Sequence, residues 1–361
     1  MRIFVFGSSI TSSYWNGAAT YYRGIYRNLA ALGHEITFAE PDAYERQQHR
    51  DDEDYSYVES LVYSTPGDLQ RMYAIASQAE LIIKHSGVGV GDAELEFAVA
   101  RGIQSTARRA FWDVDAPATL ARVEADPDPF RSLIPDFDFI FTYGGGSVVV
   151  EHYRRLGAKN CQPIYNGLEP GVHHPVPKDF SLDCDLVLVA NRLPDRERRV
   201  EQFFLRAAQL APDLRFILGG EGWSGKKLPP NVRWIGHVGT CDHNRVNCSA
   251  RMVLNINRDS MVEVGFSPPT RVFEAAGAAA CLVTDAWTGI EMFFEPGKEI
   301  LVAESAEDIV SLLRNTTGEQ AARIGLAMRE RALRDHTYAQ RAAQVSQILA
   351  NAAQQPRSAV A

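Results

Sequence analysis

The chain has 361 residues, of which 45% are hydrophobic, and a formal net charge of -8. This length and composition predict a large buried core divided between two domains. An overall acidic chain argues against general binding to nucleic acid or to an anionic membrane, because such binding requires a basic face. No apolar run approaches the roughly 18 residues of a membrane helix, and the first run meets Gly7 too soon for a secretory signal. We therefore expect a cytoplasmic protein without an integral membrane segment.

The first half of the chain repeats a rhythm of strand, loop and helix. A helix is predicted at about residues 18–32, ending at Gly33. Each apolar run ends in a polar or glycine-rich loop, which is typical of a parallel, doubly wound α/β sheet whose ligands collect outside the carboxyl ends of its strands. The predicted strands are residues 2–6, 36–40, 80–85, 107–114 and 138–143.

A segment rich in proline and glycine separates the two halves. Residues 163–177 contain four prolines and two glycines without helical or strand periodicity, so we interpret them as a linker. A second sheet follows, and a long amphipathic helix from about residue 306 to 350 is expected to cross back to the first domain, with a frayed tail beyond Gln354. The predicted domains are 1–170, 171–335 and a crossing-back segment 336–361. The strands predicted in the second sheet are residues 185–190, 215–220, 232–236, 250–256 and 280–285.

The segment Ser267 to Asp285 predicts a helix start that binds an anion. Ser267 suits an N-cap and Pro268 the first helical position, and the free amides of that first turn favour a phosphate. Glu274 lies four residues after Thr270, so its carboxylate leans back toward whatever those amides bind and could accept hydrogen bonds from ribose hydroxyls. The alternative for Glu274 is a surface ion pair with Arg271.

Candidate general bases lie on the loops of the first domain. His85, Asp113 and Asp115 end predicted strands, where an acceptor hydroxyl could be deprotonated. Each could instead cap a helix or satisfy a loop. The pair Asp113 and Asp115 would suggest a metal-bridged diphosphate in another fold, but we expect no metal here.

Two glycine-rich or aromatic loops of the first domain have open interpretations. Gly144, Gly145, Gly146 and Ser147 resemble a phosphate cradle but lack the P-loop lysine and spacing, so a flexible lip is an equal alternative. In the first loop, at residues 14–17, Tyr14 and Trp15 could stack on a sugar acceptor or pack against the second domain.

The five cysteines show no paired C-x-x-C spacing, and we expect reduced thiols. His237, Cys241, His243 and Cys248 crowd together, yet their spacing fits no zinc pattern. We therefore predict no metal and no cofactor.

The chain resembles GT-B glycosyltransferases over nearly its whole length, and more narrowly the CgeB-like glycosyltransferases. The resemblance implies two Rossmann-like doubly wound domains facing a cleft, with the acceptor bound by the first domain and the nucleotide-sugar donor by the second. The motifs that carry it are LIIKHSGVGVGDAELE, FWDVDAPATL, TYGGGSVVVEHYRRLGA, PIYNGLEPGVHHPV, ANRLPDRERRVEQFF, GHVGTCDHN, LNINRDSM, SPPTRVFEAAGAAACLVTD and GIEMFFEPGKEILV.

The resemblance also implies roles for particular donor-side residues. Asn191 and Arg192 are similar to a GRL segment of related transferases, so Arg192 would meet the diphosphate. Arg196 or Arg198 would replace a lysine of relatives, although Arg198 and Arg199 are interpreted as a solvated helix face. Many retaining relatives carry a second glutamate eight positions before the one that corresponds to Glu274, where this chain has Phe266. The remaining donor-side candidates are Gly220 (close backbone approach), His237 (nucleobase), Thr270, Arg271 and Glu274.

These observations predict a metal-independent glycosyltransferase of hexosyltransferase type that uses a nucleotide sugar, with UDP as the common leaving group of the fold. The acceptor could be a saccharide, a protein or a small molecule, and no nucleic-acid partner is expected. A nucleotide-sugar epimerase of the same fold is one alternative. A non-catalytic nucleotide-sugar-binding or coat-associated protein is the other.

Overall fold

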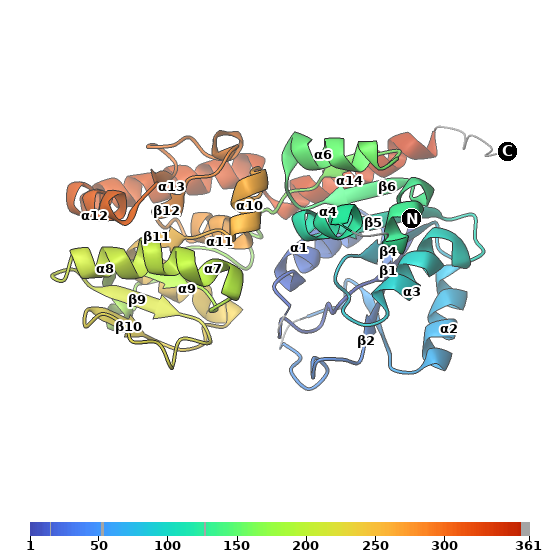
Figure 1. Ribbon diagram of the computed structural model, residues 1–361, viewed down its shortest axis with the longest axis horizontal. Helices are drawn as coiled ribbons and strands as arrows, with labels where there is room; N and C mark the ends of the chain where they lie inside the picture. Colours follow the sequence, from blue (N-terminus) through green and yellow to red (C-terminus); the bar gives the residue numbers. More distant parts are fainter. Residues whose placement is uncertain (15, 52–53, 126–127, 355–361) are drawn as a thin grey trace. The chain divides into compact units, whose positions relative to one another are not determined.

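A computed structural model describes residues 1–14, 16–51, 54–125 and 128–354 (Figure 1). The chain divides into two compact units. The first contains Met1–Asn166 together with the helix that starts at Tyr338, and the second is Gly167–Thr337. The boundaries expected at 170 and 335 lie a few residues from these, and the tail beyond Gln354, which we expect to be frayed, lies outside the described residues.

The first unit is built on a seven-stranded sheet in the order β3-β2-β1-β4-β5-β6-β7. Every neighbouring pair is parallel. In β1, Val5 is aligned with Phe38 of β2 on one side and with Ile83 of β4 on the other. Reversal of the strand order beside β1 is the pattern of a doubly wound sheet. The strands are β1 (Arg2–Phe6), β2 (Glu35–Pro41), β3 (Glu59–Tyr63), β4 (Leu81–His85), β5 (Arg108–Asp113), β6 (Phe139–Thr142) and β7 (Cys161–Pro163).

Two helices far apart in sequence cover the same part of this sheet. Helix α14 packs on α1, and their apolar side chains share one core cluster with β1, β2, β4, β5 and β6. Gly24 permits the contact, since a Cβ there would lie 2.2 Å from Cδ2 of Tyr338. The helical elements of the unit are α1 (Ala19–Ala31), α2 (Pro66–Ala76), α3 (Asp92–Phe97), η1 (Ala98–Gly102), α4 (Ala116–Ala125), α5 (Pro129–Leu133), η2 (Ile134–Asp136), α6 (Gly146–Arg155) and α14 (Tyr338–Ala353).

The second unit is built on a six-stranded sheet in the order β10-β9-β8-β11-β12-β13, again with parallel neighbours throughout. Its core joins the strands to the helices that follow β8 and β13, with Phe204, Met252 and Ile309 fully buried. The strands are β8 (Cys184–Val189), β9 (Phe216–Gly219), β10 (Val232–Trp234), β11 (Ala250–Asn255), β12 (Leu282–Asp285) and β13 (Leu301–Ala303).

The single long helix expected at 306–350 is wrong, because the structure contains three helices there. Ser305 is the N-cap of the first helix, Thr317 starts the second through a reciprocal capping box with Gln320, and the third begins at Tyr338. The helical elements of the second unit are η3 (Phe180–Leu182), α7 (Pro194–Val200), η4 (Glu201–Leu205), α8 (Arg206–Leu210), α9 (Thr240–Ser249), α10 (Asp259–Val264), α11 (Thr270–Gly277), η5 (Ile290–Met292), α12 (Ala306–Asn315) and α13 (Gly318–Asp335).

Three strands were not predicted, and all of them lie at sheet edges: β3 and β7 in the first sheet and β13 in the second. Edge strands are short and less hydrophobic, and β7 ends at Pro163, which a central strand would not tolerate. Among the described helices, none is long and apolar enough to cross a membrane.

Candidate functional site

The loops that follow β8 and β9 are held together at the carboxyl edge of the second sheet. The side-chain oxygen of Asn191 accepts from the amide of Glu221 at 3.0 Å, and the indole of Trp223 donates to the carbonyl of Ala190 at 2.7 Å. Gly220 has φ +113°, and a Cβ there would lie 2.3 Å from the Ala190 carbonyl oxygen. Only glycine fits where the loop after β9 crosses the loop after β8, and this close approach brings the two strand ends together.

Arg192, which the sequence assigns to a diphosphate, forms an ion pair in this structure. Its guanidinium lies 2.8 Å from the carboxylate of Glu197, and it also donates to the carbonyl of Gly222 at 3.4 Å. Glu197 in turn contacts Lys226 at 2.9 Å. Because Arg192 is exposed, solvent screens this pair, and the side chain can exchange Glu197 for another anion at small cost.

Arg196 lies on the first turn of α7 and is poorly neutralised. Its terminal nitrogen donates to the carbonyl of Asn191 at 2.7 Å, but its Nε is buried without a partner among the described residues. Burial and, to a smaller extent, the positive charges of Arg271 and Arg258 together lower the pKa of Arg196 to about 9, against the opposing influence of Asp195. Arg196 is therefore a partly buried cation whose charge is disfavoured by two neighbouring arginines.

Arg271 is the second cation of this group and comes from the first turn of α11. It donates to the side-chain oxygen of Asn255 at 3.0 Å, and burial lowers its pKa although Glu274 and Asp285 act in the opposite direction. Asn255 is the last residue of β11 and is fully buried. The strand end therefore fixes where this guanidinium lies.

The expected start of α11 is wrong by two residues. The helix begins at Thr270, with Pro269 in the N-cap position and no side-chain cap. Because a residue before proline is disfavoured in the helical region, Pro268 cannot begin the helix. The hydroxyl of Ser267 instead donates to the carbonyl of Gly265 at 2.8 Å.

Glu274 is 8% exposed and pairs with His243 of α9 rather than with Arg271. Its Oε2 lies 3.1 Å from Nδ1 of His243. Burial raises the pKa of Glu274, but His243, His173 and Arg271 outweigh it and lower the pKa to about 2. The predicted alternative of a surface ion pair with Arg271 is thus not what the structure contains, and the carboxylate is held ionised.

Sequence reasoning missed a buried ion pair beside these residues. Arg199, interpreted as part of a solvated face, is 15% exposed in its side chain and donates to the carboxylate of Asp285 at 2.7 Å. Asp285 ends β12, is fully buried, and accepts from the amide of Asn257 at 3.0 Å. The rule that ligands gather at strand ends would have identified Asp285. Arg198, by contrast, is 70% exposed as expected.

Two further donor-side candidates lie at the same edge. His237 follows β10 and is exposed, after Gly236 with φ +75°. Thr270 is partly exposed at the first residue of α11. The structure therefore gathers the sequence-predicted donor residues around the ends of β8, β9, β10 and β11 and the start of α11.

In the first unit, His85 lies inside the core. It is fully buried at the end of β4, its ring stacks on Tyr22 at 3.7 Å, and its Nε2 lies 2.5 Å from the hydroxyl of Tyr26. Burial, with the charge of Lys84, holds the pKa of His85 well below its usual value. This placement favours packing over proton transfer to a substrate.

Asp113 is also fully buried, at the end of β5. Its carboxylate accepts from the hydroxyl of Tyr153 at 2.6 Å, the hydroxyl of Thr119 at 3.1 Å and the amide of Asp115 at 3.0 Å. Burial raises its pKa against these hydrogen bonds. Asp113 thus ties β5 to α4 and α6, whereas Asp115 is partly exposed just before α4 and is the more accessible of the three predicted bases.

The glycine-rich loop after β6 ends at the start of α6. Gly145 is the N-cap and Gly146 the first helical residue, with φ +86° and +49°. Both conformations favour glycine, and no side chain caps this helix. The backbone therefore supports the predicted cradle geometry as well as a plain turn, and both interpretations stay predictions.

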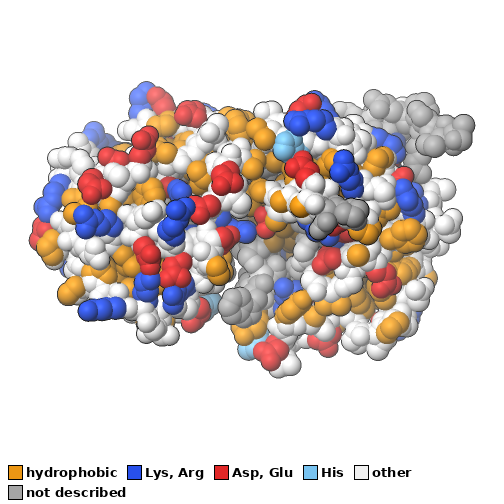
Figure 2. All heavy atoms as spheres, in the orientation of Figure 1, with side chains coloured by type: hydrophobic (Ala, Val, Ile, Leu, Met, Phe, Trp, Pro, Cys, Tyr) orange, Lys and Arg blue, Asp and Glu red, His pale blue; other side chains and the backbone are white. Residues whose placement is uncertain are grey.

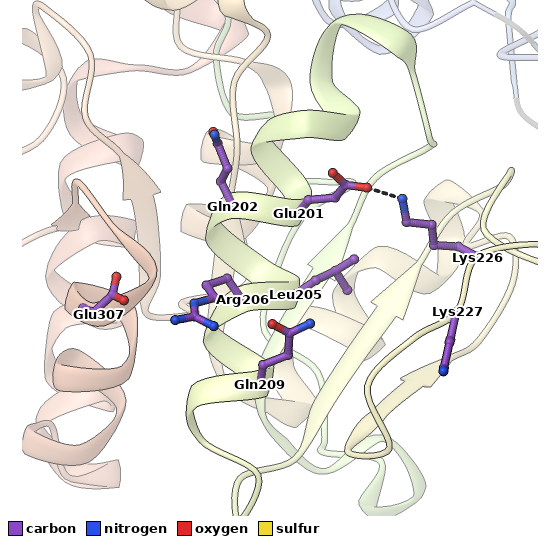
Figure 3. Close-up of a pocket in the computed structure, with 8 residues that line it drawn as sticks. All are labelled: Glu201, Gln202, Leu205, Arg206, Gln209, Lys226, Lys227 and Glu307. Carbon is purple, nitrogen blue, oxygen red and sulfur yellow. Dashed lines mark hydrogen bonds and ion pairs between the residues drawn. The ribbon is translucent and has the colours of Figure 1, made fainter.

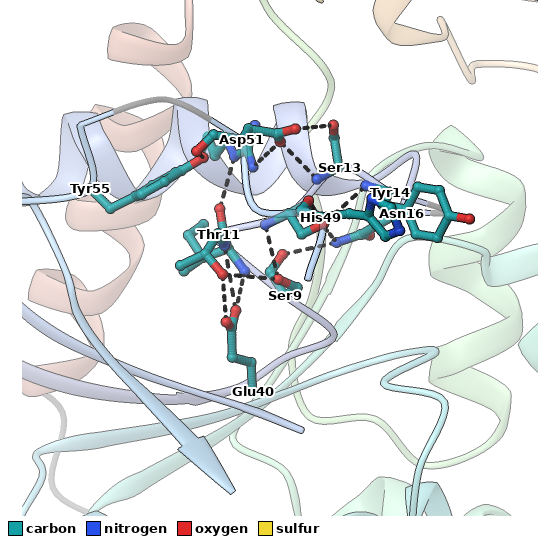
Figure 4. Close-up of polar contacts among 12 residues, drawn as sticks. Ser9, Thr11, Ser13, Tyr14, Asn16, Glu40, His49, Asp51 and Tyr55 are labelled. Carbon is teal, nitrogen blue, oxygen red and sulfur yellow. Dashed lines mark hydrogen bonds and ion pairs between the residues drawn. The ribbon is translucent and has the colours of Figure 1, made fainter. Parts of the chain in front are cut away.

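The loop after β1 is held by a dense polar network (Figure 4). Glu40, fully buried on β2, accepts from the hydroxyl of Thr11 at 2.6 Å and the amide of Ile10 at 2.7 Å. Asp51 accepts from the amide of Ser13 at 2.8 Å and from Arg23 at 2.7 Å. This bonding fixes the loop that carries Tyr14; Trp15 lies outside the described residues.

Surface charge and one surface pocket were compared with the positions of the predicted site residues. On the face drawn in Figure 2, basic and acidic side chains are interspersed rather than separated by sign. A pocket of about 520 Å³ lies over η4 and α8 and includes the contact between Lys226 and Glu201 (Figure 3). It contains none of the predicted site residues. Among the described residues no group of three or more His, Cys, Asp or Glu side chains could hold a metal ion.

Comparison with known proteins places the chain among glycosyltransferase-like folds. A family model described as glycosyl transferase-like matches residues 196–347, less than half of the chain. No curated protein matches it in sequence.

Solved structures match nearly the whole chain at low identity. One is sucrose-phosphate synthase from Thermosynechococcus elongatus, with a TM-score of 0.66 and 13% identity over 98% of this chain and 99% of that chain. Another is Alr3699/HepE from Anabaena in complex with UDP-glucose, with a TM-score of 0.67 and 13% identity over 97% of this chain and 100% of that chain. A third is an alpha-glucosyltransferase in complex with UDP, with a TM-score of 0.70 and 10% identity over 97% of this chain and 99% of that chain. The two parallel sheets and these matches confirm the predicted GT-B fold class.

Proposed function

We propose that this protein is a glycosyltransferase that binds a nucleoside diphosphate sugar on its second unit. The observation that carries the proposal is a pair of partly buried arginines, Arg196 and Arg271, at the carboxyl edge of the second sheet. The charge of Arg271 lowers the pKa of Arg196, and the Nε of Arg196 is buried without a partner among the described residues. A diphosphate would neutralise this charge, since guanidinium groups form strong charge-assisted hydrogen bonds with phosphate.

The surrounding residues suit the other parts of such a donor. The ionised carboxylate of Glu274 accepts hydrogen bonds from the ribose hydroxyls, and the first-turn amides of α11 face the phosphates. His237, exposed after β10, contacts the nucleobase. UDP is the nucleotide we propose, because solved structures of the same fold hold UDP or UDP-glucose.

Departure of the nucleoside diphosphate requires stabilisation of negative charge. Arg196 and Arg271 supply it from fixed positions, and Arg192 joins them by exchanging its ion pair with Glu197. We therefore propose transfer without a metal ion or other cofactor. A hexose is the proposed transferred sugar, and the acceptor is proposed to bind the first unit at the loop that carries Tyr14, with Asp115 as general base.

Calorimetric titration with UDP, GDP and ADP in buffer containing a chelator tests the donor site. We expect at least one of them to bind the wild type, and Glu274→Ala to bind it on the order of tenfold more weakly, as expected for loss of a charged hydrogen bond. Absence of binding by all three nucleotides, or equal binding by Glu274→Ala, would contradict the proposal. Product analysis with the sugar form of the bound nucleotide and a panel of sugar acceptors then tests transfer.

A further inference from the structure

We propose that His243 is a positioning residue for the nucleotide: it holds the carboxylate of Glu274 in the orientation that receives the ribose hydroxyls. This inference rests on the proposed function, and it adds a residue that neither the sequence motifs nor the comparisons assign. It depends on three features of the second unit: the contact between α9 and α11, the burial of that contact, and the way the segment around His173 covers it.

The contact itself is specific in its atoms. Nδ1 of His243 lies 3.1 Å from Oε2 of Glu274, so the imidazole engages one of the two carboxylate oxygens. The two side chains are 20% and 10% exposed. A carboxylate held by one neutral or charged donor in a buried setting keeps a single orientation, whereas a free one rotates among several.

The residues around His243 shift its pKa in opposing directions, and the net effect favours its charged form. Burial lowers the pKa of His243, but Glu274 outweighs it and raises the pKa, while Arg271 acts in the opposite direction. His173 from the segment before β8 is 3% exposed and lies nearly parallel to His243, with ring centroids 6.3 Å apart. Burial lowers the pKa of His173 against the opposing influence of Glu274.

Helix α9 also fixes the segment that carries His173. The side-chain amide of Asn244 donates to the carbonyl of Val172 at 2.8 Å, and its oxygen accepts from the amide of His174 at 3.3 Å. On the other side, Gly277 of α11 leaves room for this segment, since a Cβ there would lie 2.6 Å from the carbonyl oxygen of His173. His243 and Glu274 are therefore enclosed by packed elements, and the orientation of the carboxylate is set before a ligand arrives.

A positioning role makes a prediction that a purely structural role does not. If His243 acts through Glu274 on the ribose, its removal affects only ligands that have ribose hydroxyls. The test measures the affinity of wild type, His243→Ala and His243→Asn for the nucleoside diphosphate that binds in the titrations above and for its 2′,3′-dideoxy counterpart. Asn places an amide donor near the position of Nδ1 and is the conservative variant.

We expect His243→Ala to bind the ribonucleotide about tenfold more weakly, to bind the dideoxy nucleotide as the wild type does, and His243→Asn to recover part of the loss. In the Glu274→Ala background, His243→Ala should cause no further loss of affinity for the ribonucleotide, because His243 acts on the ribose only through Glu274. His174→Ala is the matched control. This substitution removes an exposed neighbouring imidazole but keeps the backbone amide of residue 174, which donates to Asn244. It should change neither the affinity for the ribonucleotide nor that for the dideoxy nucleotide.

The inference is overturned if His243→Ala and His243→Asn weaken the binding of both nucleotides equally, or weaken the binding of neither. Either result leaves the proposed donor site standing. Thermal unfolding without ligand shows whether each variant is folded, and if His243→Ala is not, the comparison is decided on His243→Asn. A wild type that binds no nucleoside diphosphate at all overturns the proposed function and this inference together. A wild type that binds the dideoxy and ribose forms equally overturns the ribose role of Glu274, and the inference with it.

Discussion

Tyr14 stacks on His49 with ring centroids 4.1 Å apart and ring planes at 25°. The two residues come from the loops that follow β1 and β2, and Figure 4 shows them side by side next to the network of Glu40 and Asp51. Tyr44 and Glu45, both with φ +57°, hold the second loop in a left-handed conformation that non-glycine residues rarely adopt. A half-exposed aromatic pair fixed in this way suits a sugar ring, so it is the acceptor platform that we propose on the first unit.

Tyr14→Ala is therefore expected to raise the KM for a sugar acceptor several-fold, to about tenfold, because it removes the stacking surface. The affinity for the nucleoside diphosphate should not change. The measurement is transfer at varied acceptor concentration, with calorimetry for the nucleotide. Phe97→Ala, at another exposed aromatic of the same unit, is the control, and an equal effect of both substitutions would argue against a specific platform.

Arg196→Gln should separate stability from binding. The substitution removes a buried cation that Arg271 and Arg258 repel, so the free energy of unfolding without ligand should fall by less than about 1 kcal/mol or rise. Affinity for the nucleoside diphosphate should fall on the order of tenfold or more. Denaturant unfolding and calorimetry give the two quantities. Arg198→Gln, 70% exposed on the same helix, should alter neither. Reduced stability with unchanged affinity would assign Arg196 a structural role instead.

Gly220→Ala should destabilise the second unit by about 2–4 kcal/mol. The added methyl group would lie 2.3 Å from the carbonyl oxygen of Ala190, and alanine strains a backbone with φ +113°. Gly225→Ala is the matched control, because its Cβ would meet nothing within 4 Å. Thermal unfolding monitored by circular dichroism compares them. Equal melting temperatures would show that the crossing of the loops after β8 and β9 relaxes easily.

The sequence predicts the central strands well because burial on both faces produces apolar runs such as residues 185–190 and 250–256. It misses β3, β7 and β13 because edge strands need no such run. The capping box at Thr317 indicates a new helix start inside residues 306–350, but the amphipathic pattern of that segment suggests a single helix.

In the candidate site, too, the local sequence predicts individual residues but not their partners from distant parts of the chain. Arg196 is predicted from the family resemblance, and Thr270 and Glu274 are predicted from their helical spacing. The partner of Glu274 is 31 positions away and that of Arg199 is 86 positions away, so no local pattern reveals them. The strand-end rule also selected His85, which aromatic neighbours from α1 bury completely. Whether an end-of-strand side chain faces solvent depends on the helix packed over it, which spacing alone does not determine.

The pair of Glu274 and His243 should make folding stability depend on pH in two windows. Glu274 has a folded-state pKa of about 2, below its ordinary 4.5, so its stabilisation is present above pH 4.5 and is lost as pH falls toward 2. His243 has a pKa raised above 6.5, so its stabilisation is complete below pH 6.5 and is lost as pH rises through the raised value. The pair should therefore contribute most between these limits.

Urea unfolding of wild type and His243→Ala at a series of pH values from about 5 to about 9 measures that contribution. We expect His243→Ala to lower the free energy of unfolding by about 2 kcal/mol at the acidic end, because it removes the partner of a buried carboxylate, and the difference should shrink as pH rises. His174→Ala should show no such trend, since its imidazole is exposed. A difference that is constant over this range would mean that His243 carries no charge in the folded protein, and that it orients Glu274 only through a neutral hydrogen bond.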